Sequence, residues 1–385
     1  MKGCSDILDA PNAAYIHIPF CKSKCTYCDF NSYAGMESLW EAYVEALLIE
    51  IRQTATSEQI RPLETVYFGG GTPTILPPDS LVRLLDAVAD SFGLCSDAEI
   101  SIEANPGTVS AESLRMLRAS GFNRLSLGVQ SFNDRLLRRI GRVHTAEEAV
   151  MAYEDARDSG FRNIGIDLIF ALPGQDLADW ESDLQELVKL LPEHASLYEL
   201  TICEDTPLGK EILSGKLAVP DEDAKLDMLL MGLDALTSAG YERYEISNYA
   251  IPGFACRHNQ TYWRNEAYYG FGAGACSYIN GVRRSNVKAP NEYLSLLSSG
   301  GSPIDWSEIT DDKQSVVETL MLALRTVEGL NLRNFARKFG YAFEDAYRQE
   351  MAELQAHKWL IVENGHMRPT NTGILMADEI AARFL

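Results

Sequence analysis

Three of the eight cysteines stand close together, as Cys21, Cys25 and Cys28 in the spacing C-x3-C-x2-C. Thiols set this closely, in a chain whose other cysteines are scattered, are typical of a metal site rather than of paired disulfides. A closed zinc site needs four ligands, but residues 29–31 (Asp, Phe and Asn) add no further Cys or His. Three thiolates in one loop favour a [4Fe–4S] cluster with one iron left open to a small molecule. A zinc knuckle with a distant fourth ligand and three unrelated core thiols are the alternatives.

The cysteine loop follows the first of six short apolar, β-branched runs, and segments with helical spacing of apolar residues separate these runs. Strand–helix alternation of this kind predicts βαβ units and a parallel sheet. Six units predict an α/β fold that forms a partial barrel, with functional residues at the C-terminal ends of the strands. The expected strands are 14–20, 65–68, 99–103, 124–130, 164–170 and 196–202, and the expected helices are 39–51, 79–92, 111–119, 146–159 and 176–191.

Local signals mark where several of these helices begin and end. Asp79, Ser80 and Ser110 stand where side-chain oxygens cap helix N-termini. Gly121 and Gly160 stand where helices should stop, because glycine readily adopts the left-handed conformation that ends a helix.

Beyond about residue 203 the alternation ends. We expect a helix over 226–239, a strand over 244–249, a hairpin turn at Asn280-Gly281 and a linker over 298–303. Helices over 316–325, 331–339 and 343–358, with a hairpin of 360–362 and 366–368 turning at Asn364-Gly365, then outline a winged helix. The predicted domains are a barrel over 1–205 that carries the cluster, an extension over 206–300 and a winged-helix-like α+β domain over 301–385.

The charge balance limits the choice of partners. Lys and Arg number 34 against 55 Asp and Glu, a net charge of −21. Such a charge repels phosphate and anionic lipid, so we expect no nucleic-acid partner and at most peripheral membrane contact. The last helix of the winged-helix outline is itself acidic, which favours protein docking or packing. No apolar run reaches the roughly 18 residues that span a bilayer, and residues 1–12 lack an apolar signal core, so we expect a cytoplasmic protein.

The segment from Tyr15 to Cys28, YIHIPFC-x3-C-x-YC, resembles the cluster loop of radical S-adenosylmethionine (radical SAM) proteins. More narrowly, the chain is similar over nearly its whole length to the family of oxygen-independent coproporphyrinogen III oxidases and the related HemW-type haem chaperones. The resemblance implies a partial (β/α)6 barrel of radical SAM type followed by the winged-helix-like domain. It also implies that Cys21, Cys25 and Cys28 bind the [4Fe–4S] cluster.

The same resemblance implies an S-adenosylmethionine site along successive strand ends. The glycine run after the second strand would meet the methionine amino group, because glycines let a ligand approach the backbone. Glu103 and Asp167 would accept hydrogen bonds from the ribose hydroxyls. Arg142 would hold the methionine carboxylate with its planar fork of donors, and Gln130 offers both a donor and an acceptor. The implied residues are Tyr15, Tyr27, Gly70, Gly71, Thr72, Glu103, Gln130, Arg142 and Asp167.

Two regions separate the oxidase from the chaperone. The oxidase has another cysteine two residues beyond the third, where this chain has Phe30, and a long segment before the cluster, where this chain has 20 residues. Residues 258–263, HNQTYW, resemble the HNxxYW motif of HemW. The resemblance implies that His258 ligates haem iron and that Asn259 belongs to the same site. Tyr262 and Trp263 would pack against the porphyrin.

The resemblance therefore implies a haem chaperone, without catalytic residues or oxidase turnover, that passes haem to apo-proteins such as respiratory cytochromes. The alternative is the oxidase itself, a radical SAM enzyme that decarboxylates coproporphyrinogen III to protoporphyrinogen IX. A third hypothesis is a non-catalytic interaction protein that acts through its C-terminal domain. Cys256, two residues before His258, is a candidate second haem ligand or a buried free thiol.

Overall fold

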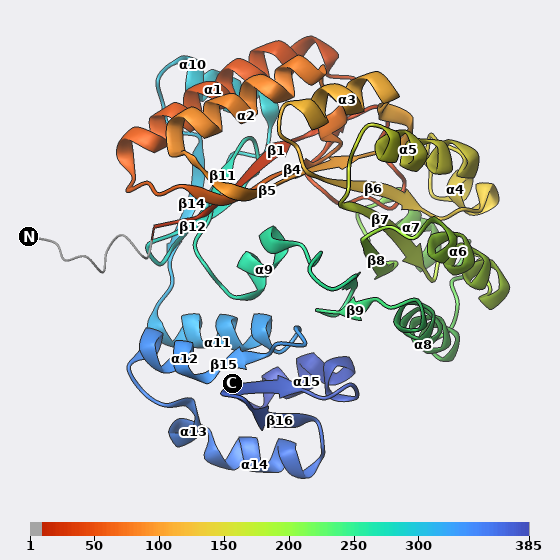
Figure 1. Cartoon of the computed structure of the whole chain (residues 1–385), viewed down its shortest axis with the longest axis vertical. Coiled ribbons are helices and arrows are strands. Elements are labelled where there is room, and N and C mark those ends of the chain that lie inside the picture. Colours follow the sequence, from red (N-terminus) through yellow and green to blue (C-terminus); the bar gives the residue numbers. More distant parts are fainter. Residues whose placement is uncertain (1–9, 385) are drawn as a thin grey trace, which may run out of the picture.

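The computed structural model describes residues 10–384. Figure 1 shows a curved sheet with helices along its outer side and a smaller C-terminal unit below it. Among the described helices none is long and apolar enough to cross a bilayer. The expectation about the start of the chain rests mainly on residues 1–9, which lie outside the described residues.

A nine-stranded sheet forms the larger unit, in the order β11-β1-β4-β5-β6-β7-β8-β10-β9. Neighbouring strands from β1 to β8 are parallel, which confirms the α/β fold and the partial barrel of six βα units. At the edges β11 is parallel to β1, and β10 is antiparallel to β8. The six central strands are β1 (Ala13–Ile18), β4 (Leu63–Gly70), β5 (Leu94–Ala104), β6 (Arg124–Gln130), β7 (Ile164–Phe170) and β8 (His194–Glu199).

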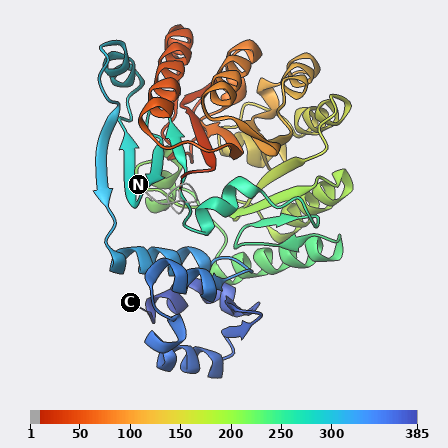
Figure 2. The ribbon, with the colours of Figure 1, turned by 60° about the vertical axis from the view of Figure 1, so that its left-hand side comes forward.

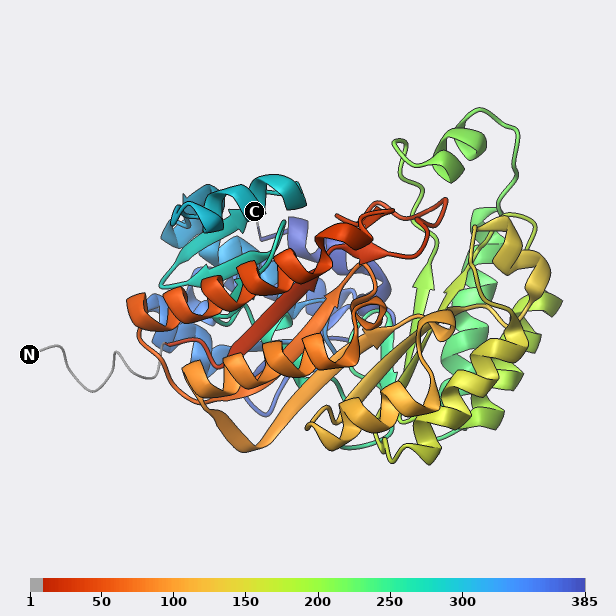
Figure 3. The ribbon, with the colours of Figure 1, turned by 90° about the horizontal axis from the view of Figure 1, so that it is seen from above.

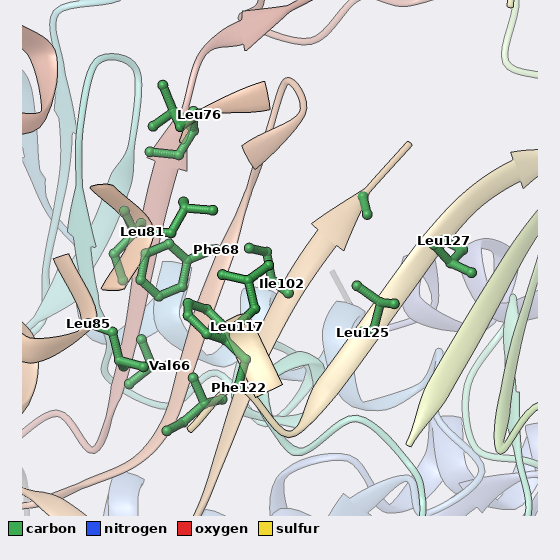
Figure 4. Packing of buried hydrophobic residues seen from close by; sticks show 14 of the residues in the cluster. Val66, Phe68, Leu76, Leu81, Leu85, Ile102, Leu117, Phe122, Leu125 and Leu127 are labelled. Atoms are coloured by element: carbon green, nitrogen blue, oxygen red, sulfur yellow. The ribbon is translucent and has the colours of Figure 1, made fainter. Parts of the chain in front are cut away.

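Helices cover the outer side of the sheet (Figures 1 and 3). They are α1 (Trp40–Ser57), α2 (Pro78–Phe92), α3 (Ala111–Ala119), α4 (Asp134–Arg139), α5 (Ala146–Asp158), α6 (Leu177–Leu190) and α8 (Glu222–Ser238). Figure 4 shows Val66 and Phe68 of β4 packed with Leu81 and Leu85 of α2, beside Ile102 of β5. All five side chains are buried, so removal of apolar surface from water holds the sheet to its helices.

The inner side of the barrel is polar. In β5, Ile100 and Ile102 belong to the hydrophobic core, and Glu99, Ser101 and Glu103 alternate with them. Successive residues of a strand point to opposite faces, so these polar residues face the lumen. The alternation continues with Arg124, Ser126 and Gly128 in β6, Gly165 and Asp167 in β7, and His194, Ser196 and Tyr198 in β8. Parallel strands buried on both faces are normally hydrophobic throughout, so the pattern indicates a lumen that holds polar groups.

The structure confirms the predicted ends of two helices. Ser110 caps α3 with a capping box. Gly121 and Gly160 follow α3 and α5 with φ of 112° and 93°, the left-handed region that glycine enters without strain.

Two other local predictions are wrong. Asp79 and Ser80 do not cap α2, which begins at Pro78 without a side-chain cap because proline suits the first helical position. Residues 244–247 are not a strand but a turn between β9 (Glu242–Arg243) and β10 (Asn248–Ala250). The N–H of Tyr244 donates to the carbonyl of Asn248 at 3.1 Å and closes this turn.

Residues after β8 extend the barrel at both edges. The Asn280-Gly281 turn joins β12 to β13 as predicted, with both residues at positive φ. β14 pairs antiparallel with β13, so residues 298–303 join α10 to this sheet and do not lead directly to the C-terminal helices, which corrects the linker prediction. The elements are α7 (Pro207–Leu213), α9 (Arg257–Trp263), β11 (Tyr269–Phe271), β12 (Cys276–Ile279), β13 (Val282–Asn286), α10 (Pro290–Ser298) and β14 (Ile304–Ile309).

The C-terminal unit has a hydrophobic core of its own, which includes Leu320, Phe335 and Met367. Its helices and the three-stranded sheet β15-β17-β16 have the predicted winged-helix outline, and the wing turns at Asn364-Gly365. The third predicted helix is interrupted at Tyr347, whose φ of −125° is not helical. The elements are α11 (Asp312–Ala323), β15 (Leu330–Asn331), α12 (Leu332–Phe339), α13 (Phe343–Ala346), α14 (Arg348–Ala356), β16 (Leu360–Glu363), β17 (His366–Pro369) and α15 (Ala377–Ala382).

Candidate functional site

The cysteine loop leaves the C-terminal end of β1. A short parallel pair of β2 (Phe20–Cys21) and β3 (Tyr33–Ala34) closes its base. Figure 3 shows this loop and the α7 segment projecting from the same end of the barrel. Cys21, Cys25 and Cys28 are free, half-buried thiols on this loop. The structure therefore brings the three predicted ligands to the end of the barrel where function was expected.

Donors surround the three sulfurs. The Thr72 hydroxyl donates to Cys21 Sγ at 3.7 Å, Arg142 Nη1 donates to Cys25 Sγ at 3.6 Å, and Ser32 Oγ lies 4.0 Å from Cys28 Sγ. Such donors favour the thiolate form that metals bind.

Burial acts in the opposite direction on two of these thiols. It raises the pKa of Cys21 and Cys28, and hydrogen bonds to each sulfur partly offset the rise. Metal binding itself removes the thiol proton. The donor set therefore fits a thiolate-bound iron–sulfur cluster. Within residues 10–384 no group of three His, Cys, Asp or Glu side chains is close enough to hold a single metal ion. A [4Fe–4S] cluster does not need such a group, because each of its thiolates binds a different iron.

The glycine run at the end of β4 packs tightly against β1. A Cβ on Gly71 would lie 2.6 Å from the Phe20 carbonyl oxygen, and one on Gly70 would lie 2.5 Å from the His17 ring. The N–H of Gly71 donates to Ile18 at 2.9 Å, which ties the two strand ends together. Glycine is therefore required here by the fold, whatever ligand the run also meets.

Glu103 is the last residue but one of β5 and lies beside this glycine run. Its Oε1 accepts the Tyr67 hydroxyl at 2.9 Å, and its Oε2 accepts the N–H of Gly70 at 3.1 Å. Burial raises the pKa of Glu103 to about 7, and the nearby Asp167 carboxylate adds to the rise. The pKa of Asp167 is also raised by burial, and Ser126 Oγ donates to it at 3.2 Å. The two carboxyls therefore lie in one polar lumen, ready to interact with a cation or with hydroxyls.

The side chains of Gln130 and Arg142 both lie beside Gly128, near the end of β6. Gln130 has a φ of 72°, unusual for a non-glycine residue, where the register of β6 and β7 shifts. Bulges and positive φ at strand ends redirect side chains and gather at functional sites. Arg142 Nη2 donates to the carbonyl of Gly128, and Nη1 donates to Cys25. Arg142 therefore links the β6 end to the cysteine loop.

The two predicted tyrosines occupy different places. Tyr15 lies inside the barrel with its hydroxyl 3.0 Å from His17 Nδ1. Tyr27 packs on a small apolar cluster with Ile140 and Leu172. Tyr15 therefore belongs to the lumen, and Tyr27 supports the cysteine loop.

The HNxxYW residues form α9, which lies between the barrel and the C-terminal unit (Figures 1 and 2). His258 is 1% exposed. Its Nδ1 is 2.8 Å from Thr65 Oγ1 and its Nε2 is 2.7 Å from the Tyr262 hydroxyl. Burial, with the Arg124 charge nearby, lowers the pKa of His258 to about 3, so the ring is neutral. Asn259, Tyr262 and Trp263 are half-buried.

The structure holds α9 from both sides. Glu99 of β5 accepts the N–H groups of Arg257 and His258, each at 3.1 Å, and so caps the helix from another element. Behind α9, Asn265 Nδ2 donates to the buried Thr319 Oγ1 of α11 at 3.1 Å. The C-terminal unit is thus packed against the helix that carries the motif.

Cys256 lies just before α9 and is fully buried. Its thiol donates to Glu99 Oε1 at 3.5 Å, and burial raises its pKa to about 12. This environment is that of a buried free thiol.

Three lumen residues were not predicted from the sequence: Tyr67, Glu99 and Arg124. Tyr67 and Glu99 contact the predicted site residues directly. Arg124 is buried, and two of its guanidinium nitrogens have no hydrogen-bond partner. The alternation of core-facing apolar residues with other residues in β4, β5 and β6 is the signal that would have identified them, because it reveals the inner face of the barrel.

A cavity of about 590 Å³ opens beside the cysteine loop. Lys24, Cys28 and Asp29 line it on the loop side, and Cys203 and Thr206 line it from the segment after β8. The cavity gives polar access to one face of the cysteine loop.

Comparison with known protein families gives separate matches for the barrel and for the C-terminal unit. The family described as the Radical SAM superfamily matches residues 15–187, and the HemN C-terminal domain matches residues 311–376. A heme chaperone HemW of Lactococcus lactis subsp. lactis (strain IL1403) is 38% identical over 379 residues, 98% of each chain. The heme chaperone HemW of Bacillus subtilis (strain 168) is 38% identical over 376 residues, 97% of this chain and 99% of its own. The solved coproporphyrinogen III oxidase (HemN) from Escherichia coli has a TM-score of 0.86 at 25% identity, over 99% of this chain and 92% of that one.

Proposed function

The chain belongs to the HemW family of haem chaperones within the radical SAM superfamily, and on that premise we propose that it binds haem and passes it to apo-proteins, respiratory cytochromes among them. The observation that carries the proposal is the position of α9. This helix brings His258 of the HNxxYW motif against Thr65 and Tyr67 of the barrel whose open end carries the predicted cofactor residues.

The residues at that open end fit the cofactors of the superfamily. Cys21, Cys25 and Cys28 would hold a [4Fe–4S] cluster. S-Adenosylmethionine would lie with its amino group against the glycine run, its ribose hydroxyls at Glu103 and Asp167, and its carboxylate at Arg142. When bound, the two supply one-electron chemistry to the site. The chain's own part is to orient the ligand through the hydrogen-bonded Glu103 and to hold the cysteine loop through Arg142.

Haem ligation would use His258. Because this imidazole is already neutral, it needs to lose no proton before it meets iron. Its two ring nitrogens both have hydrogen-bond partners, so ligation would replace the contact to Thr65 or to Tyr262. The half-buried Tyr262 and Trp263 would then pack against the porphyrin, with Asn259 beside them.

The close structural likeness to the Escherichia coli oxidase favours a second candidate function, decarboxylation of coproporphyrinogen III. We expect no such turnover. Phe30, which stands in place of the oxidase's further cysteine, is 65% exposed beside the cysteine loop. Decarboxylation requires a propionate held close to the cofactor, and misplacement lowers the rate steeply.

The measurement is conversion of coproporphyrinogen III under anoxic, reducing conditions, with the Escherichia coli oxidase as the positive control. Product at the background level is the expected result. Repeated turnover to protoporphyrinogen IX would overturn the chaperone proposal in favour of the oxidase.

Glu103 makes S-adenosylmethionine binding dependent on pH. Its pKa of about 7 leaves the carboxyl about half protonated at pH 7. Ribose hydroxyls that donate to Glu103 favour its carboxylate form, so binding at pH 7 should release about half a proton, and affinity should rise as the pH increases through 7. Calorimetry in buffers of different ionisation enthalpy measures this release.

The control is Glu103→Gln, which keeps the shape of the side chain and cannot release a proton. It should bind more weakly and show no buffer dependence. The stability of the ligand-free protein should depend on pH in the opposite direction to the affinity. The folded state holds the Glu103 proton more tightly than the unfolded state, so the contribution of this proton to folding stability is lost as the pH rises from about 4.5 to about 7. Equal proton release by the wild type and the Gln variant would contradict the assignment of Glu103.

The acceptor of haem would be a protein rather than a nucleic acid. The net charge of −21 repels phosphate backbones. The C-terminal unit contacts α9 through Thr319 and pairs Glu328 with Arg264 at 2.9 Å, which supports a packing role for this unit. We therefore infer that an acceptor reaches the haem near this junction.

A further inference from the structure

Asn31 ties the cysteine loop to a distant part of the chain. It lies three residues after Cys28, and its side-chain Nδ2 donates to two backbone carbonyls, that of Ala273 at 3.0 Å and that of Lys288 at 3.1 Å. These carbonyls belong to separate segments, one shortly after β11 and the other shortly after β13. A single amide therefore fixes the loop at two points that follow it by 242 and 257 residues.

The other polar groups of Asn31 are bonded as well. The Tyr33 hydroxyl donates to Asn31 Oδ1 at 3.0 Å, and the Asn31 carbonyl lies 2.9 Å from His17 Nε2. Gly274 leaves room for the amide, because a Cβ at this glycine would overlap Asn31 Nδ2. The position suits an amide side chain, which supplies two donors and an acceptor at once.

The two segments that hold this amide are themselves fixed by the core. Gly272, beside Ala273, donates its N–H to Glu50 at 2.8 Å. The same buried carboxyl accepts Nδ2 of Asn286, two residues before Lys288, at 2.6 Å. The cysteine loop is therefore attached to a rigid frame and takes its position from that frame.

Asn31 lies in the chain between two residues that hydrogen-bond to Cys28. Ser32 Oγ is 4.0 Å from Cys28 Sγ. Burial raises the pKa of the Cys28 thiol, and hydrogen bonds from the Phe30 backbone and the Ser32 hydroxyl oppose that rise. Because Phe30 and Ser32 are the direct neighbours of Asn31, a fixed Asn31 side chain also fixes the two donors.

We propose that Asn31 is a positioning residue of the cluster site, which holds the donors of Phe30 and Ser32 against Cys28; the inference rests on the proposed function, in which this thiolate binds the cluster. Hydrogen bonds to a ligating sulfur stabilise the reduced, more negative cluster and so raise its reduction potential. Groups that support a metal ligand also change metal affinity by about 10–100-fold. Asn31 therefore sets both the potential and the retention of the cluster, although it supplies no ligand.

The test compares the wild type with Asn31→Leu, which has a similar shape, lacks both donors and adds no charge near the cluster. The midpoint potential of the reconstituted cluster is measured without S-adenosylmethionine, by redox titration followed by electron paramagnetic resonance. The potential of the variant should be lower than that of the wild type. Its cluster should also be lost to a chelator about tenfold faster or more.

Tyr33→Phe is a milder second variant. It removes only the hydroxyl that donates to Asn31 Oδ1 and to the Lys288 carbonyl. The side chain of Asn31 keeps its own two donors in this variant, so the potential should fall by less than in Asn31→Leu.

Asn123→Leu is the matched control. Asn123 Nδ2 also donates to a carbonyl, that of Ala98 at 2.7 Å, and its Oδ1 accepts the N–H of Ile100 at 2.8 Å. This amide lies directly before β6, at the end of the barrel strands opposite to the cysteine loop. Asn123→Leu should keep the wild-type potential and the wild-type rate of cluster loss.

A wild-type potential in Asn31→Leu, whatever its rate of cluster loss, would overturn the inference and leave the proposed function standing. If that variant does not fold, a wild-type potential in Tyr33→Phe would do the same, as would an equal shift in Asn123→Leu. A wild type that binds no cluster would instead overturn the cofactor assignment in the proposed function.

Discussion

Replacement of Cys21, Cys25 or Cys28 by alanine is expected to abolish the iron–sulfur absorption of the anaerobically reconstituted protein. The three thiols are the soft ligands gathered on the loop after β1, each with a hydroxyl or guanidinium group near its sulfur. Loss of one thiolate leaves two protein ligands, too few to hold a [4Fe–4S] cluster against competing thiols in solution. Visible absorption and iron content per chain measure the effect, which should be a fall to the background.

Cys95→Ala is the matched control. Cys95 is also a free, half-buried thiol, but its Sγ contacts the Pro62 carbonyl at 3.8 Å, near the opposite end of the barrel strands. This variant should retain a full cluster. A triple variant without Cys21, Cys25 and Cys28 that still bound one cluster per chain would refute the ligand assignment.

Replacement of His258 by alanine should weaken haem binding by about a hundredfold or more, because the variant removes the proposed axial ligand. Loss of a group that only supports a metal ligand already lowers metal affinity by about 10–100-fold. The Soret band should shift or vanish while the cluster absorption stays. Cys21→Ala should show the reverse, because the thiol and the imidazole lie on separate elements, the loop after β1 and α9. Haem titrations of the two variants, with iron–sulfur spectra of each, measure both effects.

His144→Ala separates ligation from general damage to a buried imidazole. His144 is buried like His258, with its two nitrogens 3.0 Å from Asn105 Oδ1 and 3.1 Å from the Val129 carbonyl. Burial lowers its pKa to about 4. The variant should lose stability comparably and keep haem affinity. Wild-type haem affinity in His258→Ala would remove the ligand assignment.

The fold was largely predictable because its signals are local. Each barrel strand is a short apolar run, and glycines such as Gly121 and Gly160 end the helices by their own backbone preference. Predictions from local sequence were wrong where a contact with another element determines the backbone conformation. The turn over residues 244–247 is closed by a hydrogen bond to Asn248, although the sequence there is β-branched and aromatic enough to suggest a strand.

The candidate site was predictable only as an order of residues along the chain. The order of the residues on neighbouring parallel strands predicted that Glu103 and Asp167 lie in one lumen, which they do, although Asp167 lies in the middle of β7 and not at its end. Their role in ligand binding stays a prediction. The environment of His258 could not be predicted from the sequence, because its hydrogen-bond partner Thr65 is 193 residues away along the chain and Glu99 of β5 caps its helix. The sequence identified the imidazole but could not tell that it is buried and bonded at both nitrogens.

The most direct test of the haem-chaperone account is the rate of haem transfer from the loaded protein to an apo-cytochrome, followed by the Soret band. Handover through a protein–protein contact predicts a rate that rises with acceptor concentration and exceeds spontaneous haem loss to a scavenger. His258→Ala, loaded as far as it will go, should show no such acceleration. A rate that is independent of acceptor concentration and equal to that of spontaneous loss would contradict the chaperone function.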